Sequence, residues 1–243
     1  MPPRFFCAQL PDPALSEAGC ALDADESRHA QKVLRLAPGD ACELFDGAGV
    51  VARAELTGYA QNRAQLRVLS RRREEPPRPR LAVAAAVPKG PRAQDMANQL
   101  GQLGVDAFVP LRCERGVVDP GPNKLERYRL AALAAAKQSG RATVMKVRPA
   151  ETVADVLAAE PDLGLILDPG GRSGAALELP GRLATCGAAT VLVGPEGGWT
   201  DAERQSARDA GFLSWRVAPH VLRIETAAVA AAAVVRHAAL QGN

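Results

Sequence analysis

Hydrophobic and polar positions follow two different periods along the chain, and the change falls near residue 72. Before it, strand-length runs separated by turn residues occur at Ala41–Phe45, Val50–Leu56 and Ala64–Leu69. This spacing predicts antiparallel hairpins, and a small barrel is the natural way to close them. A strand over Arg4–Leu10 and one short helix over Asp25–Leu36 complete the region.

Beyond residue 80, strand-length apolar runs alternate with helical patterns. The expected strands are Leu81–Val87, Val105–Pro110, Thr143–Val147, Leu163–Leu167, Thr190–Val193 and Leu213–Val217. The expected helices are Gln94–Leu103, Asn123–Gln138, Val153–Glu160, Asp201 to about Gly211, and Thr226–Leu240. The alternation predicts an α/β domain whose parallel sheet is covered on both faces. The last helix is rich in alanine and valine, which predicts close packing on the sheet or on a partner chain.

A segment rich in charge and proline separates the two regions. Arg71–Arg80 reads RRREEPPRPR, and its charges and three prolines disfavour both a helix and a central strand. We therefore predict a β-rich domain over residues 1–72, a linker over 73–80 and an α/β domain over 81–243.

Composition limits the class of protein. The chain has 243 residues, of which 47% are hydrophobic, so it can bury a core of that size. It lacks an apolar run of about 18 residues and a signal-peptide layout at its N-terminus, so we expect a cytosolic protein without a membrane partner. Five scattered cysteines and three isolated histidines predict neither a disulfide framework nor a metal site.

Positive charge is concentrated in two segments, although the net charge is only +3. Residues 63–80 hold seven arginines against two glutamates, and residues 112–148 hold nine Lys or Arg against three acidic residues. Each segment fits a surface that faces RNA, and each also fits a solvated linker or helix face.

A polar glycine loop lies between a predicted strand and a predicted helix. Gly194–Gly198 (GPEGG) follows the apolar run that ends at Val193, and Thr200 with Glu203 forms a capping box that starts the next helix. Loops at the carboxyl ends of parallel strands line ligand crevices, and glycines let a ligand approach the backbone. The loop matches no dinucleotide or phosphate pattern, and Glu196 suits ribose hydroxyls or a cationic ligand better than a phosphate. A plain turn is the alternative.

Two further segments follow predicted strand ends. One brings Arg223, Glu225 and the free N–H groups of Ala227 and Ala228 to the start of the last helix. Its alternative is an ordinary threonine cap with a local ion pair between Arg223 and Glu225. The other segment is Leu167–Gly171, for which a simple turn is equally compatible.

Six stretches, in order along the chain, resemble the 16S ribosomal RNA uridine-N3 methyltransferases of the SPOUT, or α/β-knot, superfamily. They are RHAQKVLRL (28–36), KGPRAQDMANQLGQLGV (89–105), PLRCER (110–115), AAKQSGR (135–141), GPEGGWTDAE (194–203) and VLRIETAA (221–228). The chain departs from the family pattern at Asn98, Gln102, His220 and Ile224.

The resemblance implies an α/β fold with a C-terminal α/β-knot (SPOUT, deep trefoil) methyltransferase domain and a small N-terminal PUA-like β-barrel that binds RNA. It implies S-adenosylmethionine-dependent methylation of N3 of a specific uridine in 16S ribosomal RNA, by a cytoplasmic homodimer that needs no metal. The implied partner is 16S rRNA or the small ribosomal subunit.

The resemblance also carries site residues onto this chain. The cofactor residues are Leu167, Asp168, Pro169, Gly170, Val193, Gly194, Pro195, Glu196, Gly197, Gly198, Val217, Ala218, Val221, Leu222, Arg223 and Thr226. The catalytic candidates are Arg223, Glu225, Arg115 and Arg141, and the RNA-binding candidates are Arg4, Arg28, His29, Arg35, Lys89, Arg92 and Arg112. Two alternatives stay open: a knotted methyltransferase of another RNA, such as a tRNA ribose, and a non-catalytic RNA-binding factor for ribosome assembly.

Overall fold

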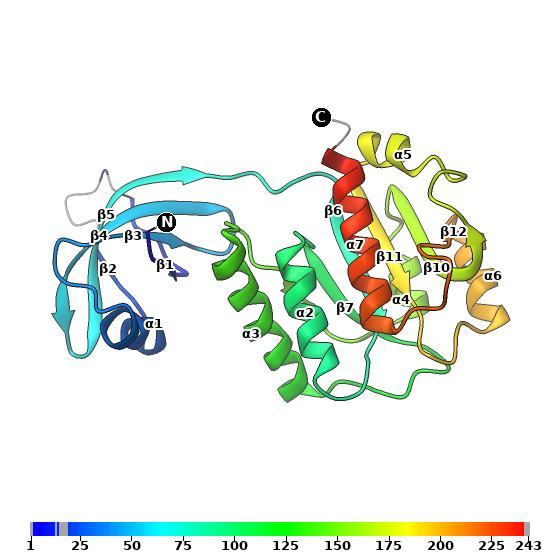
Figure 1. Ribbon diagram of the computed structural model, residues 1–243, viewed down its shortest axis with the longest axis horizontal. Coiled ribbons are helices and arrows are strands. Elements are labelled where there is room, and N and C mark those ends of the chain that lie inside the picture. The colour runs from blue at the N-terminus through cyan, green and yellow to red at the C-terminus, as the bar shows by residue number, and fades with distance from the viewer. Residues whose placement is uncertain (1, 13, 15–18, 241–243) are drawn as a thin grey trace. The chain divides into compact units, whose positions relative to one another are not determined.

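The computed structural model describes residues 2–12, 14 and 19–240, which form two compact units (Figure 1). Unit 1 comprises Met1–Pro76 and Ala136–Val144, and unit 2 comprises Pro77–Ala135 and Met145–Asn243. The boundary at Pro76 lies within the segment predicted as a linker. Over the described residues, the structure contains no helix with the length and apolar character that crossing a membrane requires.

Unit 1 contains a five-stranded sheet in the order β1-β3-β4-β5-β2. Its strands are β1 (Arg4–Phe6), β2 (Gly19–Ala21), β3 (Ala41–Phe45), β4 (Val50–Ala60) and β5 (Arg63–Arg73). β3, β4 and β5 pair antiparallel in sequence order, which confirms the predicted hairpins. β1 ends at Phe6 and not at Leu10, because its partner β3 ends at Phe45, whose carbonyl accepts the N–H of Cys7 at 2.9 Å.

The helix predicted over Asp25–Leu36 is present in two parts, α1 (Ala24–Arg28) and a π-helical turn, η1 (His29–Val33). Asp23 caps α1, since its carboxylate accepts the N–H of Glu26 at 2.8 Å. Phe5, Leu44 and Leu56 are fully buried in the core between these helices and the sheet.

Two of the five free thiols, Cys7 and Cys20, pack against this core at half-buried positions. The hydrogen bond with Cys20 lowers the pKa of Cys7 to about 7, and the same contact raises the pKa of Cys20. Burial raises the pKa of Cys42 to about 12 and that of Cys113 to about 12. Cys7 is therefore the thiol that ionises most easily among these four.

Unit 2 is built on a sheet in the order β12-β10-β11-β6-β7-β8, with β9 also beside β7. Its strands are β6 (Arg80–Ala86), β7 (Ala107–Arg112), β8 (Lys146–Val147), β9 (Glu151–Thr152), β10 (Leu163–Arg172), β11 (Ala188–Val193) and β12 (Leu213–Trp215). Every pair is parallel, which confirms the predicted sheet.

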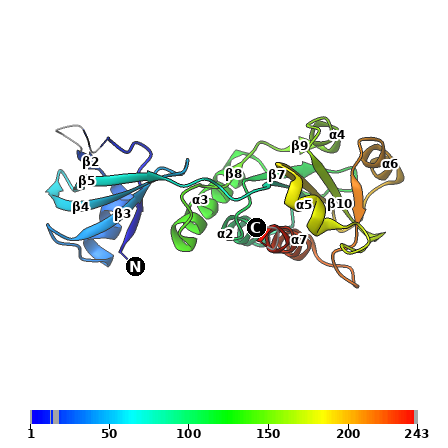
Figure 2. The ribbon, with the colours of Figure 1, turned by 90° about the horizontal axis from the view of Figure 1, so that it is seen from above.

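Helices cover both faces of this sheet. α2 (Arg92–Gln102), α5 (Leu179–Thr185) and α7 (Ile224–Leu240) lie on one face, and α4 (Val153–Leu157) and α6 (Asp201–Asp209) lie on the other (Figure 2). α3 (Pro122–Ser139) is the longest helix within the described residues and continues past Ala135. The predicted helices are therefore present. The structure adds α5, which the sequence did not predict because Pro180 and Gly181 disfavour a helix. A proline in the first turn is nevertheless compatible with a helix.

α7 packs on β6 and β11, which confirms the predicted close packing on the sheet. Its buried face includes Ala228, Ala231, Ala232 and Val235, and small side chains allow the helix to approach the strands. Arg236 anchors its C-terminal half, since its guanidinium donates to Asp106 Oδ2 at 2.9 Å and to the carbonyl of Pro79 at 2.6 Å. Burial lowers the pKa of Arg236, and the Asp106 carboxylate opposes that effect.

Several predicted elements in unit 2 have different ends, as three examples show. The strand predicted over Thr143–Val147 begins only at Lys146, because the residues up to Val144 belong to unit 1. The helix predicted to reach Glu160 ends at Leu157, and Glu160 itself has a left-handed backbone with φ 45°. β12 ends at Trp215 and not at Val217, and its last ladder bond runs from the N–H of Arg216 to the carbonyl of Arg172 at 2.8 Å.

At pH 7 we expect iodoacetamide to alkylate Cys7 faster than Cys42 or Cys113, because the thiolate is the nucleophile and the pKa of Cys7 is lowered to about 7. The rate at Cys7 rises as the pH passes through that value, while the other two stay protonated. Peptide mass spectrometry after short labelling measures the alkylated fraction of each cysteine at each pH. Cys20→Ser serves as the control and slows the reaction at Cys7; equal labelling of Cys7 and Cys42 contradicts the assignment.

Candidate functional site

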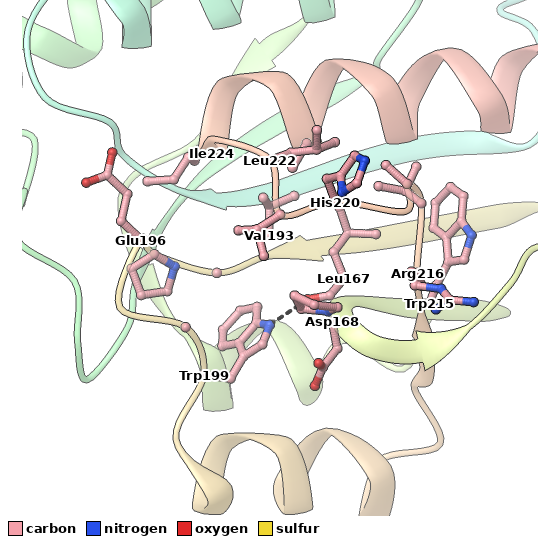
Figure 3. Close-up of a pocket in the computed structure, with 18 of the residues that line it drawn as sticks. Leu167, Asp168, Val193, Glu196, Trp199, Trp215, Arg216, His220, Leu222 and Ile224 are labelled. Atoms are coloured by element: carbon pink, nitrogen blue, oxygen red, sulfur yellow. Dashed lines mark hydrogen bonds between the residues drawn. The ribbon is translucent and has the colours of Figure 1, made fainter.

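A pocket lies at the carboxyl ends of three neighbouring strands, β10, β11 and β12 (Figure 3). Its walls are the segments that follow these strands and the first turn of α7. The predicted cofactor residues that line it are Leu167, Asp168, Pro169, Val193, Gly194, Pro195, Glu196, Gly198, Val217, Ala218, Val221 and Leu222. The structure thus brings the three predicted loops together at one edge of the sheet, where parallel folds bind ligands.

Four predicted cofactor residues do not line the pocket: Gly170, Gly197, Arg223 and Thr226. His220 and Ile224 also line it and lie within the predicted third loop, Val217–Thr226, although they are not among the named cofactor residues. Sequence reasoning missed Trp199, Arg204, Trp215, Arg216 and Ala227, which do line it. Trp199 and Arg204 stand directly after the glycine loop and one turn into the next helix, so their position beside that loop was the available signal. Nothing in the local pattern marks the others.

The first wall is a bulge within β10. Leu167 and Arg172 both pair with Trp215, so the four residues between them leave the ladder. The prediction that the strand ends at Leu167 is therefore wrong, because β10 resumes after the bulge. Asp168 Oδ1 accepts the N–H of Gly170 at 2.9 Å and stabilises the turn. Gly171 is required, since a Cβ there comes within 2.8 Å of the Trp215 backbone.

The second wall is the segment after β11, and the indole of Trp199 fixes it. Trp199 Nε1 donates to the carbonyl of Leu167 at 2.8 Å, which joins the second wall to the first (Figure 3). The ring lies against Gly194, where a Cβ comes 2.8 Å from its Cε2 atom. The predicted capping box is confirmed: Thr200 Oγ1 accepts the N–H of Glu203, and the Glu203 carboxylate accepts the N–H of Thr200.

An ion pair reinforces this connection. Arg204 Nε donates to Asp168 Oδ2 at 2.8 Å, and its Nη1 donates to the carbonyl of Trp199 at 2.7 Å. The Asp168 carboxylate raises the pKa of Arg204, so the guanidinium stays charged at every physiological pH. Arg204 therefore ties α6 to the β10 bulge.

The third wall leads from β12 into α7. The helix begins at Ile224, two residues earlier than predicted, and the N–H of Ala227 donates to the carbonyl of Arg223 at 2.8 Å. The prediction of a free N–H at Ala227 is therefore wrong, because helical bonding already starts at Arg223. Ala228 is fully buried within the helix.

Glu225 pairs with a different arginine from the one predicted. Its Oε1 lies 3.3 Å from Arg92 Nη1, and Glu196 Oε1 lies 3.8 Å from the same atom. No ion pair between described residues includes Arg223, which is exposed. The predicted local pair of Arg223 with Glu225 is thus wrong, because α2 brings Arg92 closer. The Glu196 carboxylate points away from the other labelled side chains (Figure 3).

The remaining candidates of unit 2 lie outside the pocket. Arg115 Nη1 donates to the carbonyl of Gly197 at 3.0 Å, on the outer side of the glycine loop. Lys89 is exposed at the end of the segment after β6. Arg112 is held by Asp119 at 3.1 Å and by the carbonyl of Ala150 at 3.1 Å.

The other five candidates belong to unit 1. Arg4 is largely buried: it pairs with Glu43 at 3.2 Å, lies 4.7 Å over the ring of Phe45 and donates to the carbonyl of Arg141 at 2.9 Å. Arg141 Nη2 donates to Thr143 Oγ1 at 3.1 Å. Arg28, His29 and Arg35 are exposed on and just after α1 and η1.

Comparison of the sequence with known proteins identifies two family models and several related proteins. Residues 74–236 match the model of an RNA methyltransferase domain, and residues 22–69 match an RNA methyltransferase PUA domain. Ribosomal RNA small subunit methyltransferase E of Synechocystis sp. is 34% identical over 90% of this chain and 73% of that protein. Its counterpart in Mycobacterium bovis is 33% identical over 95% of this chain and 90% of that protein.

The fold is also similar to solved structures. The crystal structure of a ribosomal RNA small subunit methyltransferase E from Neisseria gonorrhoeae, bound to S-adenosyl methionine, superposes with a TM-score of 0.84, with 30% identity and 98% of each chain covered. Within the described part of this chain, no cluster of three or more His, Cys, Asp or Glu side chains could hold a metal ion.

Replacing Gly194 by alanine tests how the second wall is packed. The added Cβ meets the Trp199 ring at 2.8 Å, and the buried ring cannot move without breaking its bond to Leu167. We expect a loss of about 1–3 kcal/mol in stability, read from the unfolding midpoint, and a red shift of tryptophan emission. Gly121→Ala, which meets nothing within 4 Å, is the control. Equal midpoints for the two variants contradict this packing.

Proposed function

The chain belongs to the ribosomal RNA small subunit methyltransferase E family, and on that premise we propose that it methylates N3 of a uridine in 16S ribosomal RNA with S-adenosylmethionine as the methyl donor. The observation that supports this most strongly is the pocket at the carboxyl ends of β10, β11 and β12. Its walls are the three loops that the family resemblance assigns to the cofactor.

The residues of the pocket fit an adenosyl ligand. Val193, Leu222 and Ile224 offer an apolar surface for a heteroaromatic ring. The glycines of the second wall bring peptide groups to the ligand, and no phosphate-binding pattern competes with this role. When bound, S-adenosylmethionine supplies a methyl group on a positively charged sulfur, so the protein contributes alignment and electrostatics.

Methylation at N3 requires the loss of a proton. Uridine N3 is protonated at neutral pH, so the site must stabilise the negative charge that develops on the flanking carbonyl oxygens. We assign this task to Arg223, with Arg115 and Arg141 as further candidates. The exposure of Arg223, directly before α7 and next to the pocket-lining Leu222, supports its place in the set. Glu225 has two alternative roles, a general base or the orienting partner of an arginine, and its ion pair with Arg92 supports the second.

RNA capture is assigned to basic side chains of both units. The match of residues 22–69 to an RNA methyltransferase PUA domain supports the role of unit 1. Arg28, His29 and Arg35 are exposed there, as Lys89 is in unit 2, so they are free to contact phosphates, which give affinity without sequence information. Arg4 and Arg112 already hold protein groups, so their contribution to RNA is the weakest of the set.

Four further properties belong to the proposal. They are a division into residues 1–72, a linker over 73–80 and a methyltransferase domain over 81–243; a deep trefoil knot in the C-terminal domain; a homodimer; and a cytoplasmic location. The family membership supports each of them, and the family resemblance also supports the residues named for the cofactor, catalysis and RNA binding.

Nucleoside mass spectrometry tests the function. We expect the purified protein with S-adenosylmethionine to form 3-methyluridine in 16S rRNA or small subunits taken from a strain that lacks the family enzyme. Gly194→Ala, which disturbs the second wall, gives less product. A methyl group found on a ribose, or cofactor binding without any methyl transfer, overturns the assignment in favour of another RNA substrate or a non-catalytic role.

A further inference from the structure

Arg92 lies outside the pocket but contacts two of its walls. It is the first residue of α2, and its Nη1 atom is 3.3 Å from Glu225 Oε1 in the first turn of α7. The same atom is 3.8 Å from Glu196 Oε1 in the glycine loop after β11. Glu196 and the neighbours of Glu225, Ile224 and Ala227, line the pocket, whereas Arg92 does not.

The pair of Arg92 with Glu225 is the stronger of the two contacts. The Glu225 side chain is 18% exposed, and its Oε2 atom is buried without a hydrogen-bond partner among the described residues. Arg92 therefore supplies the positive charge that faces this carboxylate. Removing the guanidinium leaves a largely buried carboxylate unpaired, which is far more costly than the loss of an exposed ion pair.

The contact with Glu196 has a different character. The Glu196 side chain is 63% exposed and the distance is 3.8 Å, so the contact is weak in energy. Its effect is geometric. The Glu196 carboxylate points away from the other labelled side chains (Figure 3), and its contact with Arg92 biases the glycine loop toward one position. A planar guanidinium can serve two carboxylates from one side chain, which an ammonium does less well.

We propose that Arg92 is a positioning residue, which holds the glycine loop and the start of α7 together and so fixes two walls of the cofactor pocket. This inference rests on the proposed function. It differs from the expectation that Arg92 contacts an RNA phosphate, because the guanidinium already faces two carboxylates.

The test compares Arg92→Gln with Arg127→Gln, a change at an exposed arginine of α3. Isothermal calorimetry of the full chain with S-adenosylmethionine should show about tenfold weaker binding for Arg92→Gln and no change for Arg127→Gln. In kinetics, the KM for the cofactor rises while the KM for RNA is unchanged. Arg92→Lys restores part of the affinity, since it keeps the charge but loses the planar fork.

Thermal unfolding of the cofactor-free proteins separates positioning from general stability. If Arg92→Gln lowers the melting temperature strongly, the cofactor affinity of Glu196→Gln decides the question. Glu196 is exposed, so its replacement does not threaten folding. The replacement should weaken cofactor binding in the wild-type background and have no further effect beside Arg92→Gln, which already lacks the charge that Glu196 faces.

Two outcomes overturn the inference. One is cofactor affinity equal to wild type for both Arg92→Gln and Glu196→Gln; the other is weaker RNA binding by Arg92→Gln with unchanged cofactor affinity, which assigns Arg92 to phosphate. A wild-type chain that fails to bind S-adenosylmethionine refutes the proposed function itself, and the inference with it.

Discussion

The hydrogen bond from Trp199 Nε1 to the carbonyl of Leu167 connects the segments that follow β11 and β10. It forms because Gly194 has no side chain where the indole ring lies, and because the capping box at Thr200 starts α6 directly after the tryptophan. Arg204, one turn into α6, then reaches back to Asp168 in the β10 bulge. Two walls of the pocket are therefore cross-linked twice, once by a buried neutral bond and once by an ion pair.

The third wall depends on α7, which is held at both ends. Arg236 joins its C-terminal half to Asp106, and Glu225 in its first turn faces Arg92. The carboxylates beside the pocket thus have arginine partners, and their charges orient the loops. A few ion pairs between residues that are distant in the sequence therefore fix the positions of the loops around the pocket. The strand pairing of the sheet alone does not fix these loops.

The sequence predicts what local chemistry determines. Thr200 and Glu203 are three residues apart, so their capping box can be read directly, and the alternation of strands and helices gives the parallel sheet and its ligand-binding edge. The expected α/β methyltransferase fold with an N-terminal PUA-like sheet is confirmed.

The pairing partner of Glu225 could not be predicted, because Arg92 lies 133 residues away and the nearby Arg223 is the obvious choice. The β10 bulge was missed for a similar reason: Asp168–Gly171 looks like the end of a strand unless the return of Arg172 to Trp215 is known.

We propose that the three loops at the carboxyl ends of β10, β11 and β12 form one cofactor site. Hydrogen–deuterium exchange with and without S-adenosylmethionine tests it most directly, because a bound ligand slows exchange of the amides that it covers or orders. We expect protection to be confined to peptides around residues 167–171, 194–199 and 216–227, with unit 1 unchanged. Protection in only one of these segments, or mainly in unit 1, would contradict it.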